Sequence, residues 1–80
     1  MKCYIRRCGL DQENKRIWKD SYINPIEFYD KSKREWDYYF HWVCDKQEAK
    51  QFNTIEEAKW FIKTYNLKNC DVYKKYWQNI

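Results

Sequence analysis

The residues that most often carry out catalysis are scarce in this sequence. His41 is the only histidine, and histidine is the one side chain whose ordinary pKa lies near neutral pH. Cys44, the cysteine nearest to it in sequence, lies three positions away. Successive side chains of a strand point to opposite faces, so the two would face apart and form no nucleophile–base pair. The sequence therefore predicts a protein that is not an enzyme.

Metal ions and cofactors are not expected either. The cysteines, at positions 3, 8, 44 and 70, lack the paired short spacings of a structural zinc site. Gly9 is the only glycine, which excludes a glycine-rich phosphate loop. Asp37 and Asp45 share a strand face, but eight extended residues would hold them more than about 20 Å apart.

The cysteines also bear on the compartment. The first seven residues contain no apolar run of a secretory signal. We therefore expect reduced thiols in a cytoplasmic protein, with a disulfide framework as the alternative.

The composition predicts one small soluble domain over residues 1–80. Charged residues make up 35% of the chain, and no apolar run approaches the ~20 residues of a membrane span, so we expect no membrane partner. Five Trp, eight Tyr and four Phe make up 21% of the chain. Large buried rings can stabilise a chain too short to build an ordinary core.

Apolar–polar alternation predicts strands over residues 1–7 and 15–23, hairpinned across a turn that contains Gly9 and residues 11–14. Asn24-Pro25 is expected to end the second strand, because proline cannot donate to a ladder. Residues 26–29 fit either a short edge strand or a helical turn, and residues 30–34 a charged loop. The longest alternation, over residues 35–45, carries aromatic residues and predicts a further strand. A turn at residues 46–48 would let residues 49–52 pair back, and residues 70–77 fit a final strand.

One helix is expected after Thr54. Thr54 and Glu57 have the spacing of a capping box, and Asn66 is expected to close the helix with Leu67 packing back on it. The apolar stripe of this helix consists of Ile55, Ala58, Phe61, Ile62 and Tyr65. The predicted fold is α+β: a small antiparallel sheet with one helix packed on one face, in the order β-β-(β)-β-α-β.

Trp60 is the main candidate for contact with a protein partner. It lies off the apolar stripe, between Lys59 and Lys63, and an indole there is either covered by another segment or exposed for a partner. Trp18, in a charged strand, is a second candidate of the same kind. The chain also has more large aromatics than one sheet and one helix can hide, so the outer sheet face is a possible contact surface.

Nucleic acid is the alternative partner. The net charge is +4, and residues 59–80 hold five lysines against one aspartate, which accounts for all of it. Exposed aromatics beside basic residues can stack bases and neutralise phosphates in a single strand. The candidate residues are Lys68, Lys74, Lys75 and Trp77. In the alternative interpretation Tyr73 or Tyr76 belongs to the core and the lysines are ordinary surface residues.

The segment 52–62, following the aromatic strand at 38–42, resembles a pattern found in short proteins of phages and mobile elements from low-GC bacteria. The resemblance covers about 25 residues. Several such proteins are anti-defence factors, including anti-CRISPR proteins, which act as stoichiometric inhibitors docked on an effector nuclease. The resemblance implies a host protein as partner and assigns no functional residue. A homodimer formed by edge-strand pairing is compatible with either partner.

Overall fold

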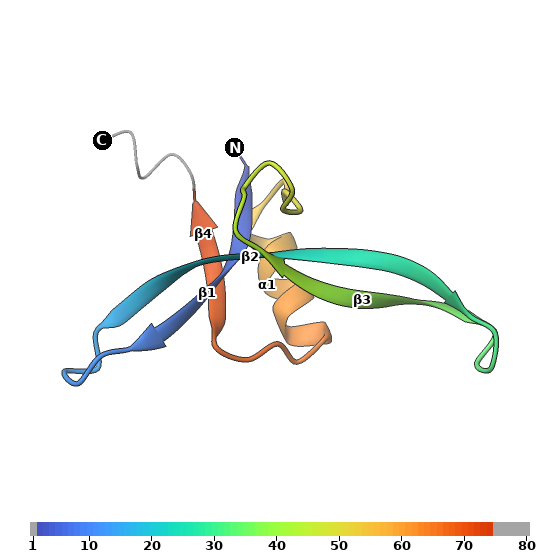
Figure 1. Cartoon of the computed structure of the whole chain (residues 1–80), viewed down its shortest axis with the longest axis horizontal. Helices are drawn as coiled ribbons and strands as arrows, with labels where there is room; N and C mark the ends of the chain where they lie inside the picture. Colours follow the sequence, from blue (N-terminus) through green and yellow to red (C-terminus); the bar gives the residue numbers. More distant parts are fainter. Residues whose placement is uncertain (1, 75–80) are drawn as a thin grey trace.

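The computed structural model describes residues 2–74, which form a four-stranded antiparallel sheet with one helix on one face (Figure 1). The strands lie in the order β3-β2-β1-β4, so β3 and β4 are the edges. The elements are β1 (Cys3–Leu10), β2 (Arg16–Asp30), β3 (Glu35–Val43), α1 (Ile55–Thr64) and β4 (Cys70–Lys74). This arrangement confirms the predicted α+β class. Residues 75–77 of the predicted last strand lie outside the described residues.

The expected end of the second strand at Asn24-Pro25 is wrong. β2 runs through both residues to Asp30 and includes residues 26–29. β1 pairs with β2 only between Arg16 and Tyr22, whereas Pro25 pairs with Phe40 of β3. Pro25 therefore has a strand partner on one side only, and such an edge position tolerates the missing N–H of proline.

Because β2 is so long, two hairpins extend from the centre of the molecule in opposite directions (Figure 1). The molecule measures 45 Å along its longest axis and 23 Å along its shortest. We call residues 26–39, at the end of the β2–β3 hairpin, the β2–β3 arm. Its turn is fixed by Asp30, whose carboxylate accepts hydrogen bonds from the hydroxyl and the backbone N–H of Ser32 and from the N–H of Lys33. These bonds, led by that from the Ser32 hydroxyl, lower the pKa of Asp30.

The main core lies between the centre of the sheet and α1. Phe61 is its central ring, in contact with the rings of Tyr38, Phe40, Phe52 and Tyr65 at centroid distances of 4.7–5.9 Å. The buried residues of this core are Cys3, Ile5, Ile23, Phe52, Ala58, Phe61 and Val72.

Phe52 enters the core by pairing with β1. It exchanges two backbone hydrogen bonds with Cys3, of 2.8 and 3.0 Å, so the segment at 49–52 joins the first strand of the chain. The predicted turn before it is present, with hydrogen bonds from the N–H groups of Glu48 and Ala49 to Asp45 and Lys46.

The opposite face of the sheet is covered at its centre by a second, smaller cluster. Its buried residues are Tyr4, Tyr22, Ala49 and Tyr73, with Trp18 and Val43 packed against them. The Arg6 guanidinium lies among these rings, 4.6 Å from the centroid of Tyr73 and 5.2 Å from that of Tyr22. Aromatic residues from three strands and the turn that carries Ala49 therefore fill the centre of the outer sheet face. Farther out along β2 and β3 the same face is exposed, as expected, at Ile26, Phe28 and Tyr39.

α1 is flanked at its two ends by the predicted residues, Thr54 and Asn66, but only one of the two hydrogen bonds of the predicted capping box forms among the described residues. The Thr54 hydroxyl accepts the backbone N–H of Glu57 at 3.1 Å. At the other end Asn66 adopts a left-handed φ of 52°, while its N–H donates to Lys63 and the N–H of Leu67 donates to Ile62. This pair of bonds is a Schellman motif, which turns the chain toward β4.

Candidate binding surfaces

The largest set of exposed apolar side chains lies on the β2–β3 arm. Five large side chains there expose between 41% and 65% of their surface: Ile26, Phe28, Tyr29, Trp36 and Tyr39. Among the described residues, the ring contacts of this hairpin with α1 and its C-cap extend only as far as Tyr38, whose ring packs on Phe61 and Tyr65. Farther out, the arm extends past the helix (Figure 1).

Both faces of the arm are apolar. Ile26 pairs with Tyr39, and Phe28 lies two residues along β2, so these three side chains share one face. Tyr29 pairs with Trp36 on the other face, where their rings meet edge to face at 5.5 Å. A partner that covers only one face would leave apolar surface in water, so the arm suits a groove that encloses it.

The charges of the arm are mixed. Residues 26–39 contain four acidic and three basic side chains, for a net charge of −1. Nucleic-acid affinity rests largely on basic side chains that neutralise phosphates. The arm has no basic excess, so its chemistry suits a protein surface.

The predicted partner residues of α1 lie on its outer side. Trp60 is 60% exposed, and Lys59 and Lys63 are exposed beside it. Trp18 lies elsewhere: it is half-buried in the cluster on the other side of the sheet, edge to face with Tyr73 at 5.2 Å. The structure therefore groups Trp60 with the two lysines and separates Trp18 from them.

The predicted nucleic-acid residues are not brought together in the described part of the chain. Lys68 is exposed in the loop before β4, and Lys74 ends that strand. The five residues of β4 alone span roughly 13 Å. Lys75 and Trp77 lie outside the described residues.

The five arm residues were not identified from the sequence. The alternation over residues 35–45 predicts a strand that includes Trp36 and Tyr39, and the charges of residues 30–34 predict a loop, but neither pattern indicates a hairpin that projects beyond the core. One available signal was the surplus of aromatics over what the core can hold. Another was the run of charges around Tyr29 and Trp36, which is unusual for a buried strand.

The histidine and the cysteines of the described residues differ in exposure and in the groups that surround them. His41 is exposed, with its ring 4.7 Å from that of Tyr39. The Cys3 thiol is buried and donates to the carbonyl of Thr54 at 3.3 Å. Burial, together with the neighbouring Cys8 and Asp71, raises the pKa of Cys70 to about 11. No group of three His, Cys, Asp or Glu side chains that could hold a metal ion occurs among residues 2–74.

These surroundings predict an order of thiol reactivity. All four cysteines are free; Cys44 is exposed, whereas Cys3 is buried and Cys8 and Cys70 are half-buried. We expect Cys44 to react with a maleimide at pH 7.5 at least tenfold faster than Cys3 and Cys70, because burial shields Cys3 and the raised pKa of Cys70 keeps its reactive thiolate scarce. Raising the pH toward 11 should increase the rate at which Cys70 reacts with the maleimide, because more of its thiol is then ionised. Peptide mapping by mass spectrometry after timed quenching measures each rate, and equal rates in the folded protein would contradict the prediction.

Comparison of the chain with protein-family models, with curated proteins and with solved structures found no match. Within residues 2–74, no helix has the length and apolar character needed to cross a membrane. Arguments about function therefore rest on the surfaces described above.

Proposed function

We propose that this chain is a non-enzymatic binding protein whose β2–β3 arm inserts into a groove on a protein partner. One observation carries the proposal: a hairpin that projects beyond the core exposes five large apolar side chains on its two faces. Tyr and Trp are common among the residues that dominate interface energetics. The arm presents Tyr29, Trp36 and Tyr39 within one hairpin.

The packing within the arm supports a preformed binding element. Tyr29 and Trp36 already contact each other, and the turn at Asp30 is closed by three hydrogen bonds. A hairpin ordered before binding loses less conformational entropy on association than a flexible loop would. The mixed charges at its tip would determine the orientation within the groove more than the affinity.

The kind of partner is part of the proposal. The resemblance to short phage and mobile-element proteins favours a host defence protein, such as an effector nuclease, and inhibition with one inhibitor bound per target. Insertion of an arm into a functional groove would inhibit by occupying it, with no chemistry required of the inhibitor. Homodimerisation through an edge strand stays a prediction, for which β3 and β4 are the available edges.

A pull-down with matched variants tests the proposal. The tagged protein is incubated with lysate of a low-GC bacterium, with and without nuclease, and bound proteins are quantified by mass spectrometry. We expect one protein in near-stoichiometric amount that resists nuclease. Trp36→Ala and Phe28→Ala, one on each face of the arm, should each reduce its recovery at least tenfold, since hot-spot truncations cost roughly 2 kcal/mol or more.

Trp60→Ala is the matched control, because Trp60 is as exposed as the arm residues but lies on α1. Full recovery with Trp60→Ala together with loss in the arm variants supports the arm. The reverse pattern would overturn the proposal and assign binding to α1. Recovery that disappears after nuclease treatment would instead favour nucleic acid.

A further inference from the structure

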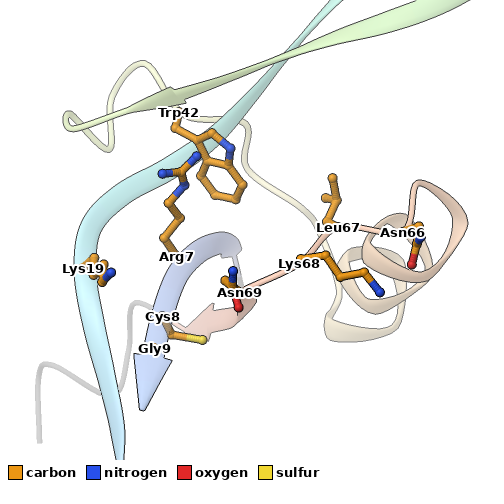
Figure 2. Close-up of a pocket in the computed structure, with 9 residues that line it drawn as sticks. All are labelled: Arg7, Cys8, Gly9, Lys19, Trp42, Asn66, Leu67, Lys68 and Asn69. Atoms are coloured by element: carbon orange, nitrogen blue, oxygen red, sulfur yellow. The ribbon is translucent and has the colours of Figure 1, made fainter. Parts of the chain in front are cut away.

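A separate cleft of about 550 Å³ lies on the helix side of the molecule (Figure 2). It is bounded by the middle of β1, by Lys19 of β2, by Trp42 near the end of β3 and by the loop between α1 and β4. We call it the basic cleft, because three cationic side chains line it: Arg7, Lys19 and Lys68. It contains no residue of the β2–β3 arm.

The charges of the basic cleft are not balanced within the described protein. No Asp or Glu lines it, and in the part of the chain that the structure describes none of its three cations belongs to an ion pair. Arg7 and Lys19 come from adjacent strands, and Lys68 comes from the loop before β4, with its side chain directed toward the Asn66 side of the cleft (Figure 2). Like charges gathered around one space repel each other, and a bound anion relieves that repulsion.

The walls of the cleft are held in place before any ligand arrives. The Arg7 guanidinium lies over the Trp42 ring at 4.5 Å, which fixes its direction (Figure 2). The loop is anchored on both sides of Lys68: the N–H of Leu67 donates to Ile62, and the N–H of Cys8 donates to the carbonyl of Asn69 at 2.9 Å. Such preorganisation reduces the entropic cost of binding.

The size of the basic cleft and its other lining residues indicate a ligand larger than a single inorganic anion. Ligand pockets for small molecules usually span 300–1,000 Å³, far more than one phosphate group needs. Asn66 and Asn69 also line the cleft, and both adopt left-handed φ values, of 52° and 58°. A side-chain amide both donates and accepts hydrogen bonds, which matches the edge of a nucleobase.

We propose that the basic cleft binds a nucleotide, with the phosphate beside the Arg7 guanidinium and with Lys19 and Lys68, which line the same cleft, adding positive charge around it. Guanidinium groups bind phosphate oxygens in a bidentate manner, and ammonium groups act as compact charges beside them. Asn66 and Asn69, which line the same cleft, are the polar side chains left to contact the sugar or the base. The ligand is either a free nucleotide or the phosphorylated end of a single strand, which share this chemistry.

Isothermal titration calorimetry of the whole chain tests the proposal with three probes: AMP, adenosine and a 5′-phosphorylated trinucleotide. We expect AMP to bind and adenosine to bind at least tenfold more weakly, because it lacks the phosphate. Arg7→Gln and Lys68→Gln should each weaken AMP binding roughly tenfold or more, as expected for a lost charged hydrogen bond. A trinucleotide bound tenfold more tightly than AMP would identify a strand end, and equal affinities a free nucleotide.

Lys33→Gln is the matched control, since it removes the same charge from the exposed turn of the β2–β3 arm. It should leave AMP affinity within about twofold, because an exposed charge farther away than a Debye length is largely screened. Lys68 is exposed in a loop, so Lys68→Gln is expected to keep the fold, which the thermal midpoint verifies. Absent binding of both phosphorylated probes, or equal weakening by the control, would overturn the proposal.

Discussion

Replacing Phe61 by alanine should lower the free energy of unfolding by about 3–5 kcal/mol, the usual cost of removing a buried phenyl ring. Phe61 is only 5% exposed and contacts four other aromatic rings. A domain of this size has roughly 4–12 kcal/mol of stability in total. The variant is therefore expected to be close to unfolding at 25 °C.

Trp60→Ala is the control for this prediction, because it removes a larger ring from the adjacent helical position. Trp60 lies outside both aromatic clusters and is largely exposed, so we expect a change within about 0.5 kcal/mol. Urea unfolding of the three proteins, followed by far-ultraviolet circular dichroism, measures both values. A similar loss in both variants would show that Trp60 belongs to the core and would remove it from the candidate binding residues.

The helix could be predicted because its determinants are local. The Thr54 hydroxyl accepts a backbone N–H within the first turn, and Asn66 ends the helix through its own left-handed backbone, so both act within one turn of the helix. Its buried residues, Ala58 and Phe61, follow from a period of 3.6 residues. No contact distant in sequence is needed to infer any of these features.

The two projecting hairpins could not be predicted from the sequence, because they depend on which strands pair and on the length over which they pair. Alternation over residues 35–45 indicates a strand with an apolar face. It does not indicate that the ring contacts with α1 and its C-cap reach only Tyr38, which leaves the outer part of the hairpin uncovered. Pro25 was interpreted as a stop because a central strand rarely accepts proline. It is accepted here since β1 pairs only with the first half of β2, a fact of sheet topology.

The candidate sites also differ in whether local sequence or only the fold indicates them. The exposure of Trp60 follows from its position relative to one helical stripe, and the structure has it exposed. The basic cleft draws residues from β1, β2, β3 and a loop, so only the fold brings Arg7, Lys19 and Lys68 together. The nucleic-acid candidates, three lysines and Trp77, are close together in sequence, but closeness in sequence does not place Lys68 beside Lys74.

Arg6 provides the second large expected effect: Arg6→Ala should destabilise the protein by about 2–3 kcal/mol, although the residue is charged and lies on the outer sheet face. Its side chain is only 13% exposed. Its guanidinium donates to the carbonyl of Lys19 at 2.8 Å and to Asp20 at 3.1 Å, while packing against the rings of Tyr22 and Tyr73. The substitution removes these bonds and also opens a gap between the rings.

Two further variants separate these contributions, and urea unfolding measures each. Arg6→Lys should recover less than half of the loss, because an ammonium group lacks the planar shape that packs between rings and the fork that reaches two acceptors. Arg16→Ala removes an equal charge from a side chain that is 51% exposed, against 13% for Arg6, and that is paired with Asp71; it should cost less than about 1 kcal/mol. If Arg6→Ala were as mild as Arg16→Ala, the hydrogen bonds and ring contacts of Arg6 would contribute little to stability, which would contradict the prediction.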